Sequence, residues 1–318
     1  MEGEFVRLSE QVDAGNAPSV TVLIPTHQRP EKVRRALRSV VAQQYPGELK
    51  AIVVFDRSEP DPALVEEFAP LHVRVTANER TPGLCGGRNT GILAADTELV
   101  AFLDDDDEWL PGKLVAQVEA LLAEPGAEFV STSMLVDFRG TESERLAGRD
   151  RVTYDELLAS RMAMLHSSSY LIRRSALLGE LGLMSEVIPG GVYEDWDVLL
   201  RAARRRPIVH VDRALVRIEW GRSSYFDEQW ETKVAALNWI LDNYPDLRSS
   251  KVGTGRLLGQ LAFAQAALRR RREAAGTAMR TFRTNWREPR GVLALAVASG
   301  LVSASTIMRV LHERGRGV

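Results

Sequence analysis

The stretch Leu99-Val100-Ala101-Phe102-Leu103-Asp104-Asp105-Asp106-Asp107 leads five apolar residues directly into four consecutive aspartates. The apolar part is predicted to be a buried strand, which places the carboxylates at its carboxyl end. Four adjacent like charges repel one another unless bulk water or a cation compensates them. Because Trp109-Leu110-Pro111 follows closely, the cluster does not lie in a freely solvated tail. We therefore expect it to bind a divalent cation, Mg²⁺ or Mn²⁺, with solvation by water as the alternative.

Three strand-like runs precede this segment and alternate with helix-like sequence. They span residues 20–24, 50–55 and 72–76, and an amphipathic segment at 31–44 separates the first two. Such alternation predicts a parallel sheet. Ligands of these sheets bind at the carboxyl ends of the strands, where loops and helix N-termini converge. The four aspartates therefore occupy the predicted place of a ligand site.

The rest of the chain is predicted to complete this sheet and then to become helical. Residues 193–206 begin with acidic residues and end in arginines before Pro207, a pattern typical of a helix. The other predicted elements are a helix at 111–123, strands at 128–136, 168–172 and 208–218, and helices from about residue 226 with breaks near 243–245, 284–285 and Gly300.

The composition is that of a folded globular protein. Of the 318 residues, 45% are hydrophobic and 26% are charged, which excludes a disordered or fibrous chain. The net charge of −2 gives no long-range field for nucleic acid, so no such partner is expected. Cys85 is the single cysteine, which excludes an intrachain disulfide and a cysteine-based zinc cluster; packing is favoured over a nucleophilic role. The acidic N-terminus lacks the apolar core of a signal peptide, and we expect a cytoplasmic protein.

Five ordered motifs resemble those of the family 2 glycosyltransferases and together cover about residues 19–224. The first is Val-Leu-Ile-Pro-Thr-His-Gln-Arg at residues 22–29, which resembles the family's opening strand and loop ending Pro-Thr-Tyr-Asn-Arg. The resemblance implies that Pro25, Thr26 and Arg29 hold the nucleotide. The histidine and glutamine depart from the family pattern.

The second and third motifs also concern the nucleotide. Residues 52–58, Ile-Val-Val-Phe-Asp-Arg-Ser, resemble the family strand that ends Asp-Asp-Gly-Ser. This implies that Asp56 accepts an NH group of the base, although phenylalanine and arginine replace the family's first aspartate and its glycine. Gly87-Arg88-Asn89-Thr90-Gly91 resembles the family's Ala-Arg-Asn-x-Gly and implies that Arg88 lies near the nucleotide.

The last two motifs carry the expected chemistry. The aspartate cluster resembles the Asp-x-Asp motif, which implies Asp106 as the strongest metal ligand, Asp104 as an auxiliary ligand and Asp105 as a contact of the ribose. Tyr193-Glu194-Asp195-Trp196-Asp197 resembles the Glu-Asp-Trp-Asp segment of the acceptor half and implies Asp195 as general base. A carboxylate must take the proton of the acceptor as its oxygen attacks the anomeric carbon, and one base without a covalent partner predicts inversion. Helix capping is the alternative role of Asp195.

Two weaker candidates stand beside these motifs. Arg222 lies where relatives often have a loop that closes on the donor, so it could bind the pyrophosphate, whereas Trp220 is as well explained by packing. His166 could face the acceptor, but a structural histidine is the favoured interpretation.

The resemblance implies a GT-A fold, which is a Rossmann-like α/β fold with a mixed, mainly parallel sheet and flanking helices. A helical appendage is expected at the C-terminus. We divide the chain into an N-terminal extension (1–18), a glycosyltransferase domain (19–225) and a C-terminal helical region (226–318). Within the domain, the nucleotide-binding half covers about 19–110 and the acceptor half about 111–225.

The implied reaction moves a sugar from a nucleoside diphosphate sugar, UDP-linked by preference, to a hydroxyl of a saccharide, lipid-linked or natural-product acceptor. Mn²⁺ or Mg²⁺ would assist it by stabilising the charge of the departing nucleotide. One alternative is a non-catalytic relative that binds nucleotide or glycan, against which Asp104, Asp106 and Asp195 argue. The other is a nucleotidyltransferase, which would carry a glycine- and lysine-rich phosphate loop that residues 25–31 lack.

Two features near the C-terminus concern partners. Arg269-Arg270-Arg271-Arg272 is expected to be a solvated helix face, with contact to anionic lipid as the alternative. Residues 291–308 carry no charge but are only mildly apolar, so a packed or interfacial helix is favoured over a membrane span. Peripheral contact with the inner face of a membrane and formation of an oligomer are both compatible with the sequence.

Overall fold

The computed structural model describes residues 12–13, 15–220 and 229–313. The chain divides into two compact units, and the division falls inside helix α8 (Glu194–Arg205). The first unit contains the residues up to Tyr154, Met162–Glu186 and Val198–Trp220, and the second contains Asp155–Arg161, Val187–Asp197 and the residues from Gly221 onward.

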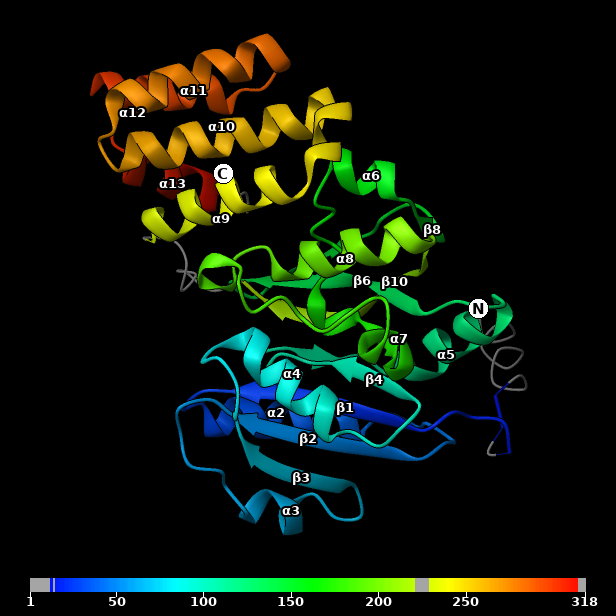
Figure 1. Ribbon diagram of the computed structural model, residues 1–318. Helices are drawn as coiled ribbons and strands as arrows, with labels where there is room; N and C mark the ends of the chain where they lie inside the picture. Colours follow the sequence, from blue (N-terminus) through cyan, green and yellow to red (C-terminus); the bar gives the residue numbers. More distant parts are fainter. Residues whose placement is uncertain (1–11, 14, 221–228, 314–318) are drawn as a thin grey trace. The chain divides into compact units, whose positions relative to one another are not determined.

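The first unit is built on a ten-stranded sheet with the order β3-β2-β1-β4-β9-β6-β10-β5, in which β7 pairs with β6 and β8 with β10 (Figure 1). Strands β3, β2, β1 and β4 are parallel, and β9 is antiparallel to β4 and β6. The predicted mixed sheet is confirmed. The strands are β1 Val20–Thr26, β2 Leu49–Phe55, β3 His72–Ala77, β4 Leu99–Phe102, β5 Glu108–Trp109, β6 Phe129–Phe138, β7 Thr141–Arg145, β8 Arg151–Val152, β9 Leu171–Arg173 and β10 Ile208–Glu219.

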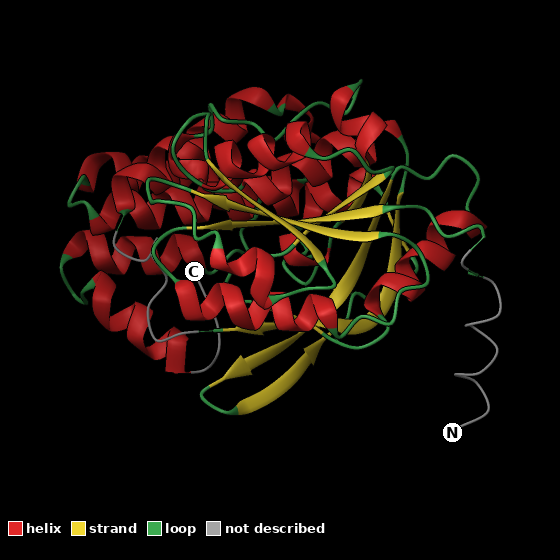
Figure 2. Ribbon diagram, turned by 90° about the horizontal axis from the view of Figure 1, so that it is seen from below, coloured by secondary structure: helices red, strands yellow, loops and turns green. Residues whose placement is uncertain are grey.

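Helices flank this twisted sheet (Figure 2). Strand β1 is buried at every residue, as expected for a central parallel strand covered on both faces. Val22 and Ile24 belong to the same hydrophobic core as Leu37 of α2. The side chain of Leu23 lies toward α4, where a Cβ at Gly91 would come within 3.0 Å of its Cδ2 atom, so glycine permits the close approach. The helices of this unit are α2 Pro30–Val41, α3 Ala63–Glu67, α4 Leu84–Ala94, α5 Lys113–Ala123 and α7 Arg174–Leu178, with the 3₁₀ turn η1 at Ser167–Ser169.

The second unit is helical, as predicted for the C-terminal part of the chain. Helix α10 forms its centre, because α9, α11, α12 and α13 all pack against it. Trp230 of α9 meets Phe263 of α10 edge-on, with 5.7 Å between the ring centroids. The elements are α6 Tyr154–Ala159, η2 Pro189–Gly191, α9 Trp230–Asn243, η3 Pro245–Ser249, α10 Lys251–Ala267, α11 Arg271–Thr284, α12 Arg290–Ser299 and α13 Ala304–Glu313.

Two expectations about the C-terminal helices need correction. The run of four arginines is not one helix face, because Arg269 adopts a φ of +59° in the turn between α10 and α11. Residues 291–308 form two helices instead of one, since Gly300 ends α12 in the left-handed conformation that glycine adopts without strain. In the described part of the chain, none of the helices has the length and apolar character needed to span a bilayer.

Candidate functional site

The carboxyl ends of β1 and β4 bring the second and third aspartates of the run, Asp105 and Asp106, against the β1–α2 loop. The Thr26 hydroxyl, at the last residue of β1, donates to Asp105 at 2.8 Å. Arg29 Nη1 donates to Asp105 at 3.0 Å and to Asp106 at 2.9 Å. Burial raises the pKa of Asp105, while the bonds from Thr26 and Arg29 act in the opposite direction. Asp106 is the most open of these carboxylates, with 37% of its side chain exposed, and Lys32 lies 3.5 Å from it.

Asp104 is held from behind by an arginine without any exposed surface. Arg88 Nη2 donates to Asp104 Oδ1 at 2.6 Å and to the Ser167 hydroxyl at 2.9 Å. Ser167 in turn donates to Asp104 Oδ2 at 3.0 Å. Burial alone would raise the pKa of Asp104, but Arg88, His166 and the Ser167 hydroxyl together outweigh it and lower the pKa. The side chain is therefore an oriented carboxylate.

The fourth aspartate and a histidine complete a group that could hold a metal. Asp107 accepts the Ser168 hydroxyl at 2.5 Å, and His166 Nδ1 lies 3.3 Å from its Oδ2 atom. Burial and the neighbouring Asp104 raise the pKa of Asp107 well above its ordinary value. Asp104, Asp107 and His166 each offer a ligand atom, and these atoms lie within 4.8 Å of one another. Two carboxylates and an imidazole form a donor set that fits Mn²⁺, and the carboxylates also suit Mg²⁺.

The sequence prediction assigned no role to Asp107 and favoured a structural His166. The sequence does indicate Asp107 as a possible metal ligand, because it is the fourth residue of the aspartate run. The turn η1, which follows His166 and whose Ser168 bonds Asp107, is fixed from the core because Trp109 Nε1 donates to the Ser168 carbonyl at 2.8 Å. Lys113 Nζ lies 3.8 Å from the centre of the Trp109 ring.

Asp56 lies directly after β2 and is nearly buried, with 9% of its side chain exposed. Asn78 Nδ2 donates to its Oδ1 atom at 2.8 Å, and Arg57 Nε donates to its Oδ2 atom at 3.0 Å. Burial would raise the pKa of Asp56, but the hydrogen bonds from Asn78, the Gly83 backbone and Arg57 together outweigh it and lower the pKa. Asn78, after β3, lies in none of the sequence motifs, so its role beside Asp56 is visible only in the structure.

Pro25 is the remaining nucleotide candidate that the structure describes. Pro25 is buried in β1, pairs with Val54, and lies so near α4 that a Cβ at Gly87 would be 3.2 Å from its own Cβ. Glu186 accepts Asn89 Nδ2 of α4 at 2.6 Å and the backbone NH of Thr81, in the loop before α4, at 3.3 Å. Burial would raise the pKa of Glu186, but its hydrogen bonds lower it to about 2. Arg222 lies outside the described residues.

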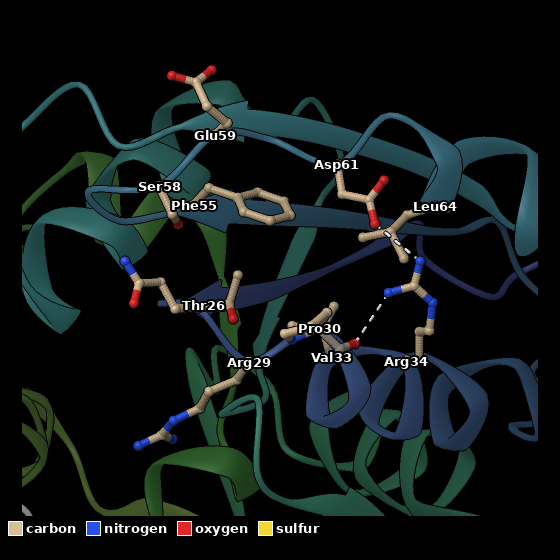
Figure 3. A pocket seen from close by; sticks show the side chains of 11 residues that line it. Thr26, Arg29, Pro30, Val33, Arg34, Phe55, Ser58, Glu59, Asp61 and Leu64 are labelled. Atoms are coloured by element: carbon tan, nitrogen blue, oxygen red, sulfur yellow. Dashed lines mark hydrogen bonds and ion pairs between the residues drawn. The ribbon is translucent and has the colours of Figure 1, made fainter.

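A small pocket of about 180 Å³ opens beside the site (Figure 3). Thr26 and Phe55, from the ends of β1 and β2, line it together with Arg34 of α2, which donates to Asp61 at 2.9 Å. Ligand pockets usually measure about 300–1,000 Å³, so this one could hold only part of a nucleotide-sized ligand.

Asp195 belongs to the second unit and has its own partners there. Its Oδ2 atom accepts Arg161 Nη2 at 2.6 Å, and its Oδ1 atom accepts the Trp196 backbone NH at 2.7 Å. The Trp196 ring is fixed in turn, because its Nε1 donates to the Leu157 carbonyl at 3.1 Å. With 11% of its side chain exposed, Asp195 is a restrained acceptor of hydrogen bonds at the start of α8.

Comparison with known proteins identifies the family. Residues 21–178 match the model of glycosyl transferase family 2. The chain is 25% identical over 139 residues to the Escherichia coli UDP-Glc:alpha-D-GlcNAc-diphosphoundecaprenol beta-1,3-glucosyltransferase WfgD, covering 44% of this chain and 54% of that protein. It is 29% identical over 136 residues to the Campylobacter jejuni GalNAc(5)-diNAcBac-PP-undecaprenol beta-1,3-glucosyltransferase, covering 42% and 43%. The matched parts thus span about half the length of these relatives.

Solved structures agree on the fold over most of the chain. S. aureus TarS 1-349 in complex with UDP-GlcNAc superposes with a TM-score of 0.62 at 18% identity, covering 94% of this chain and 92% of that one. The mannosyltransferase PcManGT from Pyrobaculum calidifontis, in complex with GDP-Man and Mn²⁺, gives 0.57 at 17% identity, covering 96% and 88%. The fold is GT-A, and the chain belongs to glycosyl transferase family 2.

Proposed function

We propose that the chain transfers a sugar from a nucleoside diphosphate sugar to a hydroxyl group of an acceptor, with inversion at the anomeric carbon. The observation that carries this proposal is the arrangement at the ends of the parallel strands. The exposed carboxylate of Asp106 lies there beside Arg29 and Lys32, and the partly buried Asp104 is paired with the fully buried Arg88. Family membership supports the assignment.

The donor is proposed to be a UDP-sugar. Asp56, oriented by Asn78, would accept an NH group of the base, and Pro25 and Thr26 would line the same side of the nucleotide. Asp105 would contact the ribose, and Arg222 the pyrophosphate. The E. coli relative named above uses UDP-Glc, and TarS was solved with UDP-GlcNAc, which favours uridine; the GDP-Man complex of PcManGT makes guanosine the alternative.

A divalent ion, Mn²⁺ or Mg²⁺, is proposed to bind at the aspartates. We favour Asp106 as the ligand nearest the donor, because 37% of its side chain is exposed against 19% for Asp104. Its partner Arg29 is itself 45% exposed and would turn to the diphosphate when the ion binds, whereas the partner of Asp104 is the buried Arg88. The group of Asp104, Asp107 and His166 is the alternative place. The bound ion would supply positive charge to the diphosphate that leaves. PcManGT was solved with Mn²⁺.

Asp195 is the proposed general base. A base must be ionised when the acceptor binds, and the ion pair with Arg161 favours the ionised form. The Trp196 NH holds Oδ1 and Arg161 holds Oδ2, so the carboxylate has a fixed orientation. The second lone pair of Oδ2 would take the proton of the acceptor hydroxyl.

The acceptor is proposed to be a lipid-linked saccharide, because the names of both curated relatives specify an undecaprenol diphosphate acceptor. The reaction would then take place at the cytoplasmic face of a membrane. The division into a glycosyltransferase domain at 19–225 and a helical region at 226–318 is part of this proposal.

The test is a transfer assay with UDP-sugars, Mn²⁺ and a short-chain lipid diphosphate saccharide. We expect a product of inverted anomeric configuration by proton NMR, and Asp195→Asn should lower kcat by roughly 10²–10⁴-fold while leaving donor binding intact. A product of retained configuration would refute the single-displacement mechanism. Full activity of Asp195→Asn would remove the proposed base.

A further inference from the structure

Helices α11 and α12, with the turns that follow them, carry exposed apolar and basic side chains. Met279 of α11 is 50% exposed, Trp286 between the helices 74%, Val292 of α12 60%, and Leu301 after it 84%. Both helices pack against α10 and against each other, so their sides away from α10 face outward together (Figure 1). Scattered apolar residues are normal on a surface, but several on one helix pair indicate a contact area.

The charge of this segment is strongly one-sided. Residues 269–295 contain eight arginines and two glutamates, with neither lysine nor aspartate. The glutamates are used internally: Glu273 lies 4.0 Å from Arg270, and Glu288 accepts Arg290 at 2.6 Å. No ion pair to Arg283 is found among residues 12–13, 15–220 and 229–311, and Arg287 lies over the Trp286 ring at 5.1 Å. Arg287 therefore places positive charge directly against the exposed tryptophan.

We propose that the outward side of α11 and α12, with Trp286 and Leu301, docks on the anionic surface of a lipid bilayer. Arginines near an anionic leaflet each strengthen binding roughly fivefold. Tryptophan prefers the headgroup region, and Val292 and Leu301 would enter the adjoining acyl boundary. The proposal goes beyond the proposed reaction and does not depend on it.

Two other partners fit this surface less well. A second copy of the same face would bring like charges together, which disfavours a symmetric dimer. Nucleic acid would satisfy the arginines but would leave Val292 and Leu301 without an apolar contact. A bilayer satisfies both kinds of side chain.

The experiment is co-sedimentation of the full chain with vesicles of phosphatidylcholine alone or mixed with phosphatidylglycerol. Two double variants test the two contributions separately: Arg283→Gln with Arg287→Gln, and Trp286→Ser with Leu301→Ser. The control is Arg38→Gln with Val41→Ser, an exposed basic and apolar pair on α2 of the first unit.

We expect wild type to bind the mixed vesicles only, and high salt to release it. The arginine variant should bind roughly 30-fold more weakly and the apolar variant at least roughly tenfold more weakly, with unchanged melting temperatures and donor affinity. The control variant should bind like wild type.

Equal binding to both vesicle types, or none, would overturn the proposal. So would a dimer in light scattering that only the two double variants abolish, or displacement from vesicles by duplex DNA. Since donor affinity is measured on the same variants, failure here is distinguishable from failure of the proposed reaction.

Discussion

Replacing Arg88 by methionine tests how the carboxylate cluster is held together. The wild-type guanidinium has no exposed surface and donates to Asp104 and Ser167 at 2.6 and 2.9 Å. Methionine fills similar space but leaves Asp104 as an uncompensated carboxylate close to Asp107. Breaking one side of a buried ion pair costs about 3–5 kcal/mol. For a protein of this size, each kcal/mol shifts the melting temperature by about 2–4 °C, so Arg88→Met should melt roughly 6–20 °C lower.

The assay is thermal unfolding followed by circular dichroism, with a double-mutant cycle. The matched control is Arg74→Met on β3, an exposed arginine whose replacement should change stability by no more than about 0.5 kcal/mol. Adding Asp104→Asn to Arg88→Met removes the unpaired negative charge, so the double variant should recover part of the lost stability. The reasoning is refuted if Arg88→Met melts within about 2 °C of wild type, or if Asp104→Asn adds to the loss instead of offsetting it.

Two further predictions use other buried groups. Burial lowers the pKa of His210 to about 4, although Asp212 acts in the opposite direction, so between pH 6.5 and 4 the unfolded chain binds a proton that the folded chain does not. The free energy of unfolding should therefore fall by up to roughly 3 kcal/mol as the pH drops through this window. Urea unfolding at several pH values should show a weaker dependence of this free energy on pH for His210→Gln than for wild type. An unchanged pH dependence contradicts the assignment. Asp106→Ala should weaken Mn²⁺-dependent donor binding by at least roughly tenfold, while His166→Ala should change it little. A larger loss in His166→Ala than in Asp106→Ala would instead assign the metal to the group of Asp104, Asp107 and His166.

The local elements of the fold were predictable because their patterns are local. The predicted strand at 20–24 falls within β1, which is buried on both faces, and the apolar run before Asp104 forms β4. The predicted amphipathic helix at 31–44 is α2, which begins at Pro30 and ends earlier, at Val41. Periodicity and turn residues suffice for elements of this kind.

The partners of the aspartates could not be predicted, since they come from distant parts of the chain. Ser167 and Ser168 lie more than 60 residues after the carboxylates that they bond, and Asn78 reaches Asp56 across 22 residues. No periodicity connects such positions; only the strand order does. The turn at Arg269 was missed for a different reason, because an arginine with positive φ gives no sequence signal of the kind that glycine gives.

The measurement that tests the central claim most directly is a calorimetric titration of the wild-type chain and Asp106→Ala with UDP-, GDP- and TDP-sugars, each with and without Mn²⁺. The proposed transferase site predicts that wild type binds one donor, UDP-linked by preference, only when Mn²⁺ is present, and that Asp106→Ala abolishes this dependence. Absence of binding to all three donors in both metal states would contradict a nucleotide-sugar site. Binding of a GDP- or TDP-sugar alone would keep the site and replace uridine as the base.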